Sequence, residues 1–229
     1  MSNDVSKMSN LFLLCAVLIL FNLSCINVVF ASNSKVGNLD AKCELAKQYL
    51  NGNGVEQNYS EAIRLYTQAA KSGSARAQNQ LGIMYSEGMG VDQNCSEAVK
   101  WYNKAVKQNY VKAKENLAVR YYQGVCVDRD IPKALKLFKA CAKAGNAHCI
   151  DSVSVIYQKE LGDNQMAFKW ALKAAEAGNP KSQMIVGSMY YQGEGVGKNR
   201  SLGIHWLKKA ASQGNETAID ILRDGGINN

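Results

Sequence analysis

Hydrophobic and polar positions recur along this chain with a long period and, inside each period, with the spacing of an amphipathic helix. Five tyrosines mark the period, at intervals of 36, 36, 36 and 33 residues: Tyr49, Tyr85, Tyr121, Tyr157 and Tyr190. Around the second of them, Ala77 and Leu81 stand eight and four residues earlier, which places all three on one face of a helix. Tandem units of this length are typical of helical repeat proteins.

Each unit predicts two antiparallel helices joined by a glycine-containing loop. Five units follow one another, at residues 39–74, 75–110, 111–146, 147–179 and 180–215, and residues 216–229 predict a capping half-unit and a tail. The second helix begins after a residue that makes a good N-cap, in the column Asn58, Asn94, Asp130, Asp163 and Asn199. In the first two units Glu61 and Glu97 follow three residues later, which predicts a capping box.

The first residues of the chain predict an export signal. Lys7 precedes an apolar run from Leu11 to Phe21, and Val29-Phe30-Ala31 resembles a signal peptidase site. We therefore expect residues 1–31 to be removed, residues 32–38 to form a linker, and no integral membrane span to remain. A single membrane anchor and a lipid-modified cysteine are the alternatives, and polar residues inside the apolar stretch argue against the anchor.

Composition favours a folded helical protein with a basic surface. Hydrophobic residues make up 47% of the chain, there are only two prolines, and 27 Lys+Arg against 19 Asp+Glu give a net charge of +8. No cluster of five or more basic residues occurs, so we interpret the charge as a solubility feature and expect no nucleic-acid partner. The two histidines, His148 and His205, are too few for a histidine-rich metal site.

No set of residues predicts catalysis. The single Ser-x-x-Lys motif, at residues 32–35, falls at the expected mature N-terminus, and neither Lys-Thr-Gly nor Ser-Asp-Asn occurs to complete a penicillin-recognising serine site. The glycine loops lack the Lys-Ser/Thr pair that follows a phosphate-binding loop. We expect no catalytic residue, cofactor or metal, and hence a protein that is not an enzyme.

The recurring residues resemble the Sel-one-like repeat, a relative of the tetratricopeptide repeat. The second unit carries the pattern in ARAQNQLGIMYSEGMGVDQNCSEAVKWYNKAVKQNY, with the glycine loop and a tryptophan in the second helix, and the resemblance covers residues 39–215. It implies an all-α fold, a right-handed α/α superhelix (solenoid) in which stacked units share one core and form a long groove. It also implies binding of other proteins, and the nearest branch is that of the bacterial cysteine-rich proteins.

Five cysteines belong to the expected mature chain. Cys141 and Cys149 lie eight residues apart across a tight turn between units, where a disulfide can form, and the same spacing resembles the staples of the cysteine-rich branch. Two buried free thiols are the alternative. Cys95 and Cys126 lie in or beside the loops of adjacent units but in different columns, so the sequence leaves their pairing open. Cys43 is then the odd thiol.

A candidate partner-binding face lies opposite the buried face of the first helix. At 100° per residue, positions 76, 79, 80, 83 and 87 fall there, and the column through position 83 is apolar in three consecutive units. Basic residues, His148 and amide residues border this stripe, which suits an acidic peptide. The alternative is that the aliphatic residues pack between neighbouring first helices. The predicted partner-binding residues are Arg76, Gln80, Ile83, Glu87, Lys112, Asn116, Val119, Gln123 and Val155.

Together these features predict an exported scaffold, periplasmic or secreted, that binds a protein or peptide. The resemblance suggests envelope regulation or contact with host cells. A weak penicillin-binding or β-lactamase-like protein is the alternative that the cysteine-rich branch suggests, and the missing serine motifs argue against it. A third interpretation is an eukaryotic luminal adaptor, since glycosylation acceptors such as Asn58-Tyr59-Ser60 occur. The partner, the organism and the oligomeric state are left open by the sequence.

Overall fold

The computed structural model describes residues 37–226, and these residues are helical with no β-strand among them. The helical residues 37–51 are followed by α2 (Tyr59–Lys71), α3 (Ala75–Glu87), α4 (Cys95–Lys107), α5 (Val111–Gln123), α6 (Ile131–Ala142), α7 (Ala147–Lys159), α8 (Asn164–Glu176), α9 (Pro180–Gln192), α10 (Arg200–Ala211) and α11 (Glu216–Asp224). Residues 37 and 38, which we expected in a linker, are helical. The expected signal peptide, at residues 1–31, lies outside the described residues.

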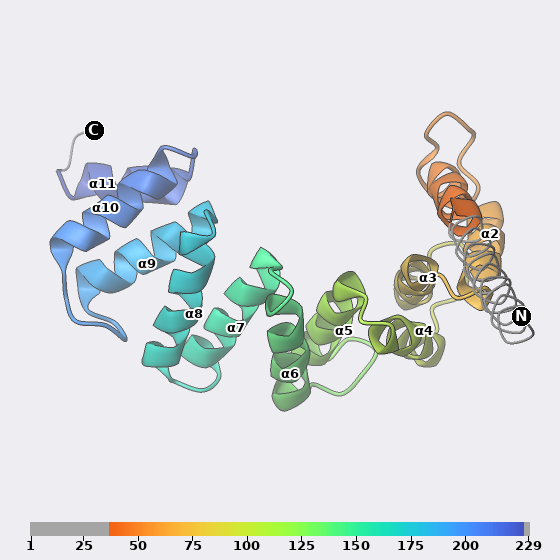
Figure 1. Cartoon of the computed structure of the whole chain (residues 1–229), viewed down its shortest axis with the longest axis horizontal. Helices are drawn as coiled ribbons and strands as arrows, with labels where there is room; N and C mark the ends of the chain where they lie inside the picture. The colour runs from red at the N-terminus through yellow and green to blue at the C-terminus, as the bar shows by residue number, and fades with distance from the viewer. Residues whose placement is uncertain (1–36, 227–229) are drawn as a thin grey trace, which may run out of the picture. The chain divides into compact units, whose positions relative to one another are not determined.

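The chain forms two compact units, Met1–Ala77 and Gln78–Asn229. In the second unit each helix from α4 to α11 packs on the next one along the chain, so that α5, α7 and α9 alternate with α6, α8 and α10 (Figure 1). This alternation is the expected sequence of first and second helices. Among residues 37–226, no helix combines the length and the apolar character needed to cross a membrane.

Each second helix begins at its predicted cap. The side-chain oxygens of the five cap residues accept a hydrogen bond from the backbone N–H three residues later, at 2.9–3.0 Å, and the caps are Asn58, Asn94, Asp130, Asp163 and Asn199. The N–H of each cap in turn donates to the carbonyl of the recurring tyrosine, as Asn94 does to Tyr85 at 2.8 Å. The loop between the two helices is therefore closed by one backbone bond.

The predicted capping box is half wrong. Its first bond forms, from the Glu97 N–H to Asn94, but the Glu97 carboxylate binds Lys100 at 2.7 Å instead of the cap N–H. The same change occurs in the first repeat, where Glu61 binds Arg64. The reason is that the cap N–H already donates to the tyrosine carbonyl.

The shortened loop of the fourth repeat keeps this closing bond. Asp163 N–H donates to the Tyr157 carbonyl at 2.9 Å, although only six residues separate them where nine separate the partners elsewhere. Gly162 makes the tighter turn with a φ of 66°, a conformation that costs glycine little. The missing three residues therefore shorten the loop without detaching the second helix from the first.

Small residues let the two helices of a repeat lie close together. A Cβ at Gly82 would stand 2.7 Å from the Tyr102 ring, and one at Gly187 would stand 2.8 Å from the Leu207 side chain. Ala118 holds the same position in the third repeat and is fully buried. A larger side chain at this position would therefore collide with the second helix of the repeat.

Candidate functional site

A hollow of about 290 Å³ lies between α5 and α7 in the second unit. Its apolar lining comes from three helices and consists of Val119, Tyr122, Phe138, Val155 and Ile156. Polar and charged side chains complete it, namely Glu115, Gln123, His148, Asp151, Ser152 and Lys181. The hollow thus combines a hydrophobic surface with polar groups that can orient a ligand, which is the usual composition of a binding pocket.

One ion pair of the preceding repeat is not repeated at the hollow. In the repeat before it, Arg120 of α5 reaches back to Glu87 of α3 and forms an ion pair. Thirty-six residues later the same two positions hold Ile156 and Gln123, which form no ion pair. An aliphatic side chain and an amide, Ile156 and Gln123, therefore line the hollow where the preceding repeat has an ion pair.

The two carboxylates of the hollow are already hydrogen-bonded. Asp151, which is 8% exposed, accepts from the Ser182 hydroxyl and from the Asn179 amide, the latter at 3.3 Å. Glu115 accepts from the Asn146 amide at 3.2 Å and lies 3.4 Å from the Lys112 ammonium. Both asparagines cap the first helix of the following repeat, so these carboxylates join consecutive repeats.

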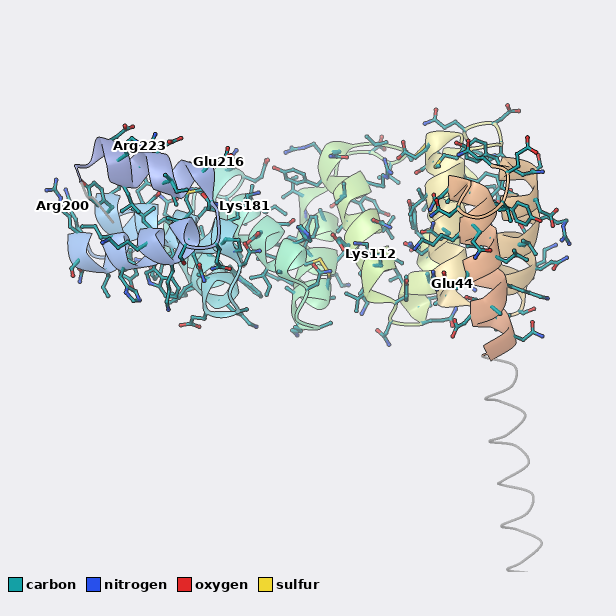
Figure 2. All side chains as sticks on the ribbon, turned by 90° about the horizontal axis from the view of Figure 1, so that it is seen from above. Glu44, Lys112, Lys181, Arg200, Glu216 and Arg223 are labelled. Atoms are coloured by element: carbon teal, nitrogen blue, oxygen red, sulfur yellow. A yellow bond between two sulfur atoms is a disulfide. The ribbon has the colours of Figure 1, made fainter. Side chains whose placement is uncertain are left out.

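The basic residues of the hollow are exposed. The side chains of His148 and Lys181 make no hydrogen bond or ion pair within residues 37–226, and both line the hollow. The Ser152 hydroxyl is used internally, because it donates to the His148 carbonyl at 2.8 Å. Lys112 on α5 and Lys181 on α9 are labelled in Figure 2. In the sequence they belong to the same column of the repeat as His148 of α7.

Tyr122, at the edge of the hollow, is held by the next loop. Its hydroxyl donates to the Glu160 carboxylate at 3.2 Å, and Arg129 forms an ion pair with the same carboxylate at 2.7 Å. The hydrogen bond from Arg129 lowers the pKa of Glu160, whereas burial raises the pKa of Tyr122. Glu160 is therefore charged, and Tyr122 is the neutral donor of the pair at neutral pH.

Three of the nine predicted partner-binding residues line the hollow: Val119, Gln123 and Val155. Ile83, from the same column, is half-buried and packs against the cluster of Ala98, Tyr102 and Leu117 instead. Val119 also packs against a core cluster. Ile83 and Val119 therefore pack within the solenoid, as the alternative interpretation of the apolar stripe expected.

The other six predicted residues lie outside the hollow. Arg76 belongs to the first unit, where it pairs with Glu44 at 2.6 Å. Asn116 donates to the buried Asn79 at 2.8 Å, and Gln80 accepts from Asn79 at 3.4 Å. The remaining two are Glu87, which pairs with Arg120, and Lys112, which lies beside Glu115.

The column through position 79 meets the expectation only in part. We expected it to face the groove or solvent, but Asn79 is only 2% exposed, and the same column supplies Glu115 and Asp151 to the hollow. A signal for this role is present in the sequence. An asparagine cap stands 31 residues after Glu115 and 28 residues after Asp151, where it bonds them.

Two disulfides join consecutive repeats beside the hollow. Cys141, at the end of α6, is bonded to Cys149, at the start of α7, with Cα atoms 5.8 Å apart. Cys95, at the start of α4, is bonded to Cys126, in the loop after α5, with Cα atoms 4.6 Å apart. Cys43 is buried and free, and its sulfur lies 3.5 Å from the Ser74 hydroxyl. The third and fourth repeats, which supply most of the lining, are thus joined by one disulfide, and the third repeat is joined to the second by the other.

The consecutive helix pairs define an all-α repeat scaffold, and the expected α/α solenoid class is confirmed. A sequence model of the Sel1 repeat matches residues 39–74, 75–110, 111–146, 158–179 and 180–215. The chain therefore belongs to the Sel1 repeat family, whose members commonly mediate protein interactions.

Two solved structures support this assignment. The protein c5321, described as a protective antigen present in uropathogenic Escherichia coli strains displaying an SLR fold, is 31% identical with a TM-score of 0.74, over 81% of this chain and 40% of that one. A Sel1 repeat protein from Oxalobacter formigenes is 30% identical with a TM-score of 0.69, over 80% of this chain and 74% of that one.

A curated relative matches a shorter stretch. The chitin synthase regulator SKT5 of Saccharomyces cerevisiae is 43% identical over 67 residues, which are 28% of this chain and 10% of that protein. The chain thus spans a tenth of SKT5 and less than half of c5321.

Proposed function

We propose that this protein is an exported, non-enzymatic scaffold that binds another protein or a peptide through the groove of its first helices. The observation that carries the proposal is the hollow between α5 and α7, where Val119 and Val155 offer half-buried aliphatic surface to a partner. Membership of the Sel1 repeat family supports a binding role. Apolar surface bordered by polar groups is the usual make-up of a protein interface.

An acidic partner is part of the proposal. Lys112, His148 and Lys181 are all exposed and occupy one column of the first helices, so a partner lying along the groove meets them in turn. Opposite charge on the partner favours encounter and correct orientation.

A periplasmic or extracellular location is supported by the cysteines. Disulfides persist in oxidising compartments, and four of the five cysteines in residues 37–226 are paired. The apolar leader and its cleavage motif, read from the sequence, agree with export. A role in envelope regulation or in contact with a host is the biological setting that we propose, and the likeness to c5321, a protective antigen, supports the second of these.

Comparative affinity capture tests this function. The exported protein, the double variant Val119→Ser/Val155→Ser and the control Leu202→Ser are immobilised, and the captured proteins are quantified by mass spectrometry. Leu202 is an exposed aliphatic residue of α10 outside the hollow. We expect a partner that the wild type and the control capture equally and the double variant loses. Equal capture by all three proteins overturns the proposal.

A further inference from the structure

We propose that the hollow between α5 and α7 takes one apolar side chain of an extended peptide, while His148 and Lys181 take a carboxylate about three residues away on the same peptide. This inference rests on the proposed function and specifies the chemistry of the partner at that site. The carboxylate comes from an Asp or Glu side chain or from the end of a chain, and the test below separates these sources.

The apolar half of the proposal follows from the size and lining of the hollow. About 290 Å³ is near the lower end of the range for small-molecule pockets, ~300–1,000 Å³, so a side chain fits better than a whole cofactor. Phe138 and Ile156 are almost fully buried and form part of the lining, with Val119 and Val155 half-buried beside them. An aliphatic or aromatic side chain placed there gains burial that the hollow cannot obtain from its own residues.

The choice of a carboxylate follows from which polar groups are already bonded. Among the charged lining residues, Glu115 and Asp151 accept hydrogen bonds from the caps of the following repeats. His148 and Lys181 have no such partner within the described part of the chain. Lys181 is thus the charged lining residue that remains available, with the His148 imidazole as a second unbonded group, so the occupant that satisfies Lys181 is an acceptor with negative charge.

The spacing follows from the course of α7. His148, Ser152 and Val155 stand at i, i+4 and i+7, so they lie on one side of the helix. Seven residues of helix rise by about 10 Å, at ~1.5 Å per residue. An extended peptide covers ~3.3 Å per residue, so roughly three residues separate the carboxylate from the apolar side chain.

Selection from a random peptide library tests the motif directly. The disulfide-bonded protein is presented with a library of linear peptides in two formats, one with the random segment internal and one with it at a free C-terminus. We expect enrichment of peptides with an apolar residue and an Asp or Glu about three positions apart. Enrichment in the second format alone, with the apolar residue about three positions from the end, assigns the carboxylate to a chain terminus.

Charge reversal provides the second part of the test. Lys181→Glu is compared with Lys169→Glu, which makes the same change at an exposed lysine of α8 outside the hollow. We expect Lys181→Glu to weaken a selected peptide about tenfold and to shift the enriched charge from Asp and Glu toward Lys and Arg. Lys169→Glu should leave both unchanged.

The outcomes separate this inference from the function on which it rests. Peptides that bind, lose affinity in Val119→Ser/Val155→Ser and show no acidic preference overturn the carboxylate site and leave groove binding intact. An acidic preference that Lys181→Glu does not alter also overturns it. If no enriched peptide depends on Val119 and Val155, groove binding itself is wrong, and the inference falls with it.

Discussion

Gly195, in the loop after α9, lies directly against Asn164, the first residue of α8 and part of the preceding repeat. A Cβ on Gly195 would stand 2.0 Å from the Asn164 carbonyl oxygen, and the φ of Gly195 is 69°. Cys126 holds the same loop position two repeats earlier with a φ of 64°, and it is bonded to Cys95, the first residue of α4. The same contact between repeats is thus made by bare backbone in one place and by a disulfide in the other.

Gly195→Ala should destabilise the protein for two reasons. The new methyl group collides with the backbone of Asn164, and alanine disfavours a positive φ. We expect a loss of roughly 1–3 kcal/mol in the free energy of unfolding, measured by urea denaturation. Gly197→Ala is the matched control, since its φ is not positive and no atom lies within 4 Å of the added Cβ. Equal losses in the two variants contradict the close contact.

This contact explains why the sequence left one disulfide open. Cys95 and Cys126 occupy different positions within their repeats. Aligning the repeats shows which residues share a position, but it does not show which loop of one repeat contacts which helix of another. The helix caps, by contrast, could be predicted from the sequence. The Asn94 side chain accepts a hydrogen bond from the N–H three residues later, so the interaction is local, and the start of the helix was predicted correctly.

Removing either disulfide should lower stability, and more so for the one that closes the longer loop. In the chain-entropy model, Cys95→Ser/Cys126→Ser costs about 4 kcal/mol for a separation of 31 residues, and Cys141→Ser/Cys149→Ser about 2–3 kcal/mol for a separation of eight. Cys95→Ser/Cys126→Gly should recover part of the first loss, because glycine suits the positive φ at this position. Urea unfolding with and without reductant measures these differences.

Thiol counting is the control for that series. If the leader is removed and both disulfides form, the exported protein has one reactive thiol in denaturant, that of Cys43. After reduction it should have five. Alkylation of Cys141 and Cys149 in the native oxidised protein would contradict the disulfide between them.

The protein should lose stability in acid through the Asp130 cap. The hydrogen bond from the Lys133 N–H, followed by the one from the Lys133 side chain, lowers the pKa of Asp130 below its ordinary value of 3.8. Because the folded pKa is the lower one, the stabilisation is present above pH ~4 and is lost as the pH falls through the folded value. Asp130→Asn keeps a capping side chain that does not titrate, so its urea midpoint should fall less between pH 6 and pH 3.

Asp128→Asn is the control for the acid effect. It removes the same charge from an exposed residue two positions earlier that is not the helix cap. Its urea midpoint should fall with pH as much as that of the wild type. Identical pH dependence in the Asp128 and Asp130 variants means that the cap does not cause the loss.

The candidate site was only partly accessible to sequence reasoning. The helical periodicity placed Val119 and Val155 on the inner face correctly, because that inference uses only 100° per residue. It missed that Ile83 packs against a core cluster outside the hollow, whereas the other two line the hollow. That difference lies in tertiary contacts, the packing of Ile83 against a cluster that includes Tyr102 and Leu117, which the period of one helix does not contain.

Serine substitutions should separate lining residues from core residues. Val119→Ser and Val155→Ser remove half-buried methyl groups, and we expect each to cost about 1 kcal/mol or less. Val153, on the same helix as Val155, is fully buried, and Val153→Ser should cost about 2–4 kcal/mol because it leaves a cavity and a hydroxyl in the core. Circular-dichroism melts of the three variants measure the difference.

Ile83→Ser makes this comparison specific to the hollow. Ile83 shares the column of Val119 and Val155 and is also half-buried, but it packs against Ala98, Tyr102 and Leu117 and does not line the hollow. We expect it to cost as much stability as Val119→Ser while leaving the affinity for a groove partner unchanged. If Ile83→Ser weakens binding as strongly as Val155→Ser, the binding face extends along the whole stripe. If Val119→Ser and Val155→Ser melt as early as Val153→Ser, these valines belong to the core and the hollow is not a binding surface.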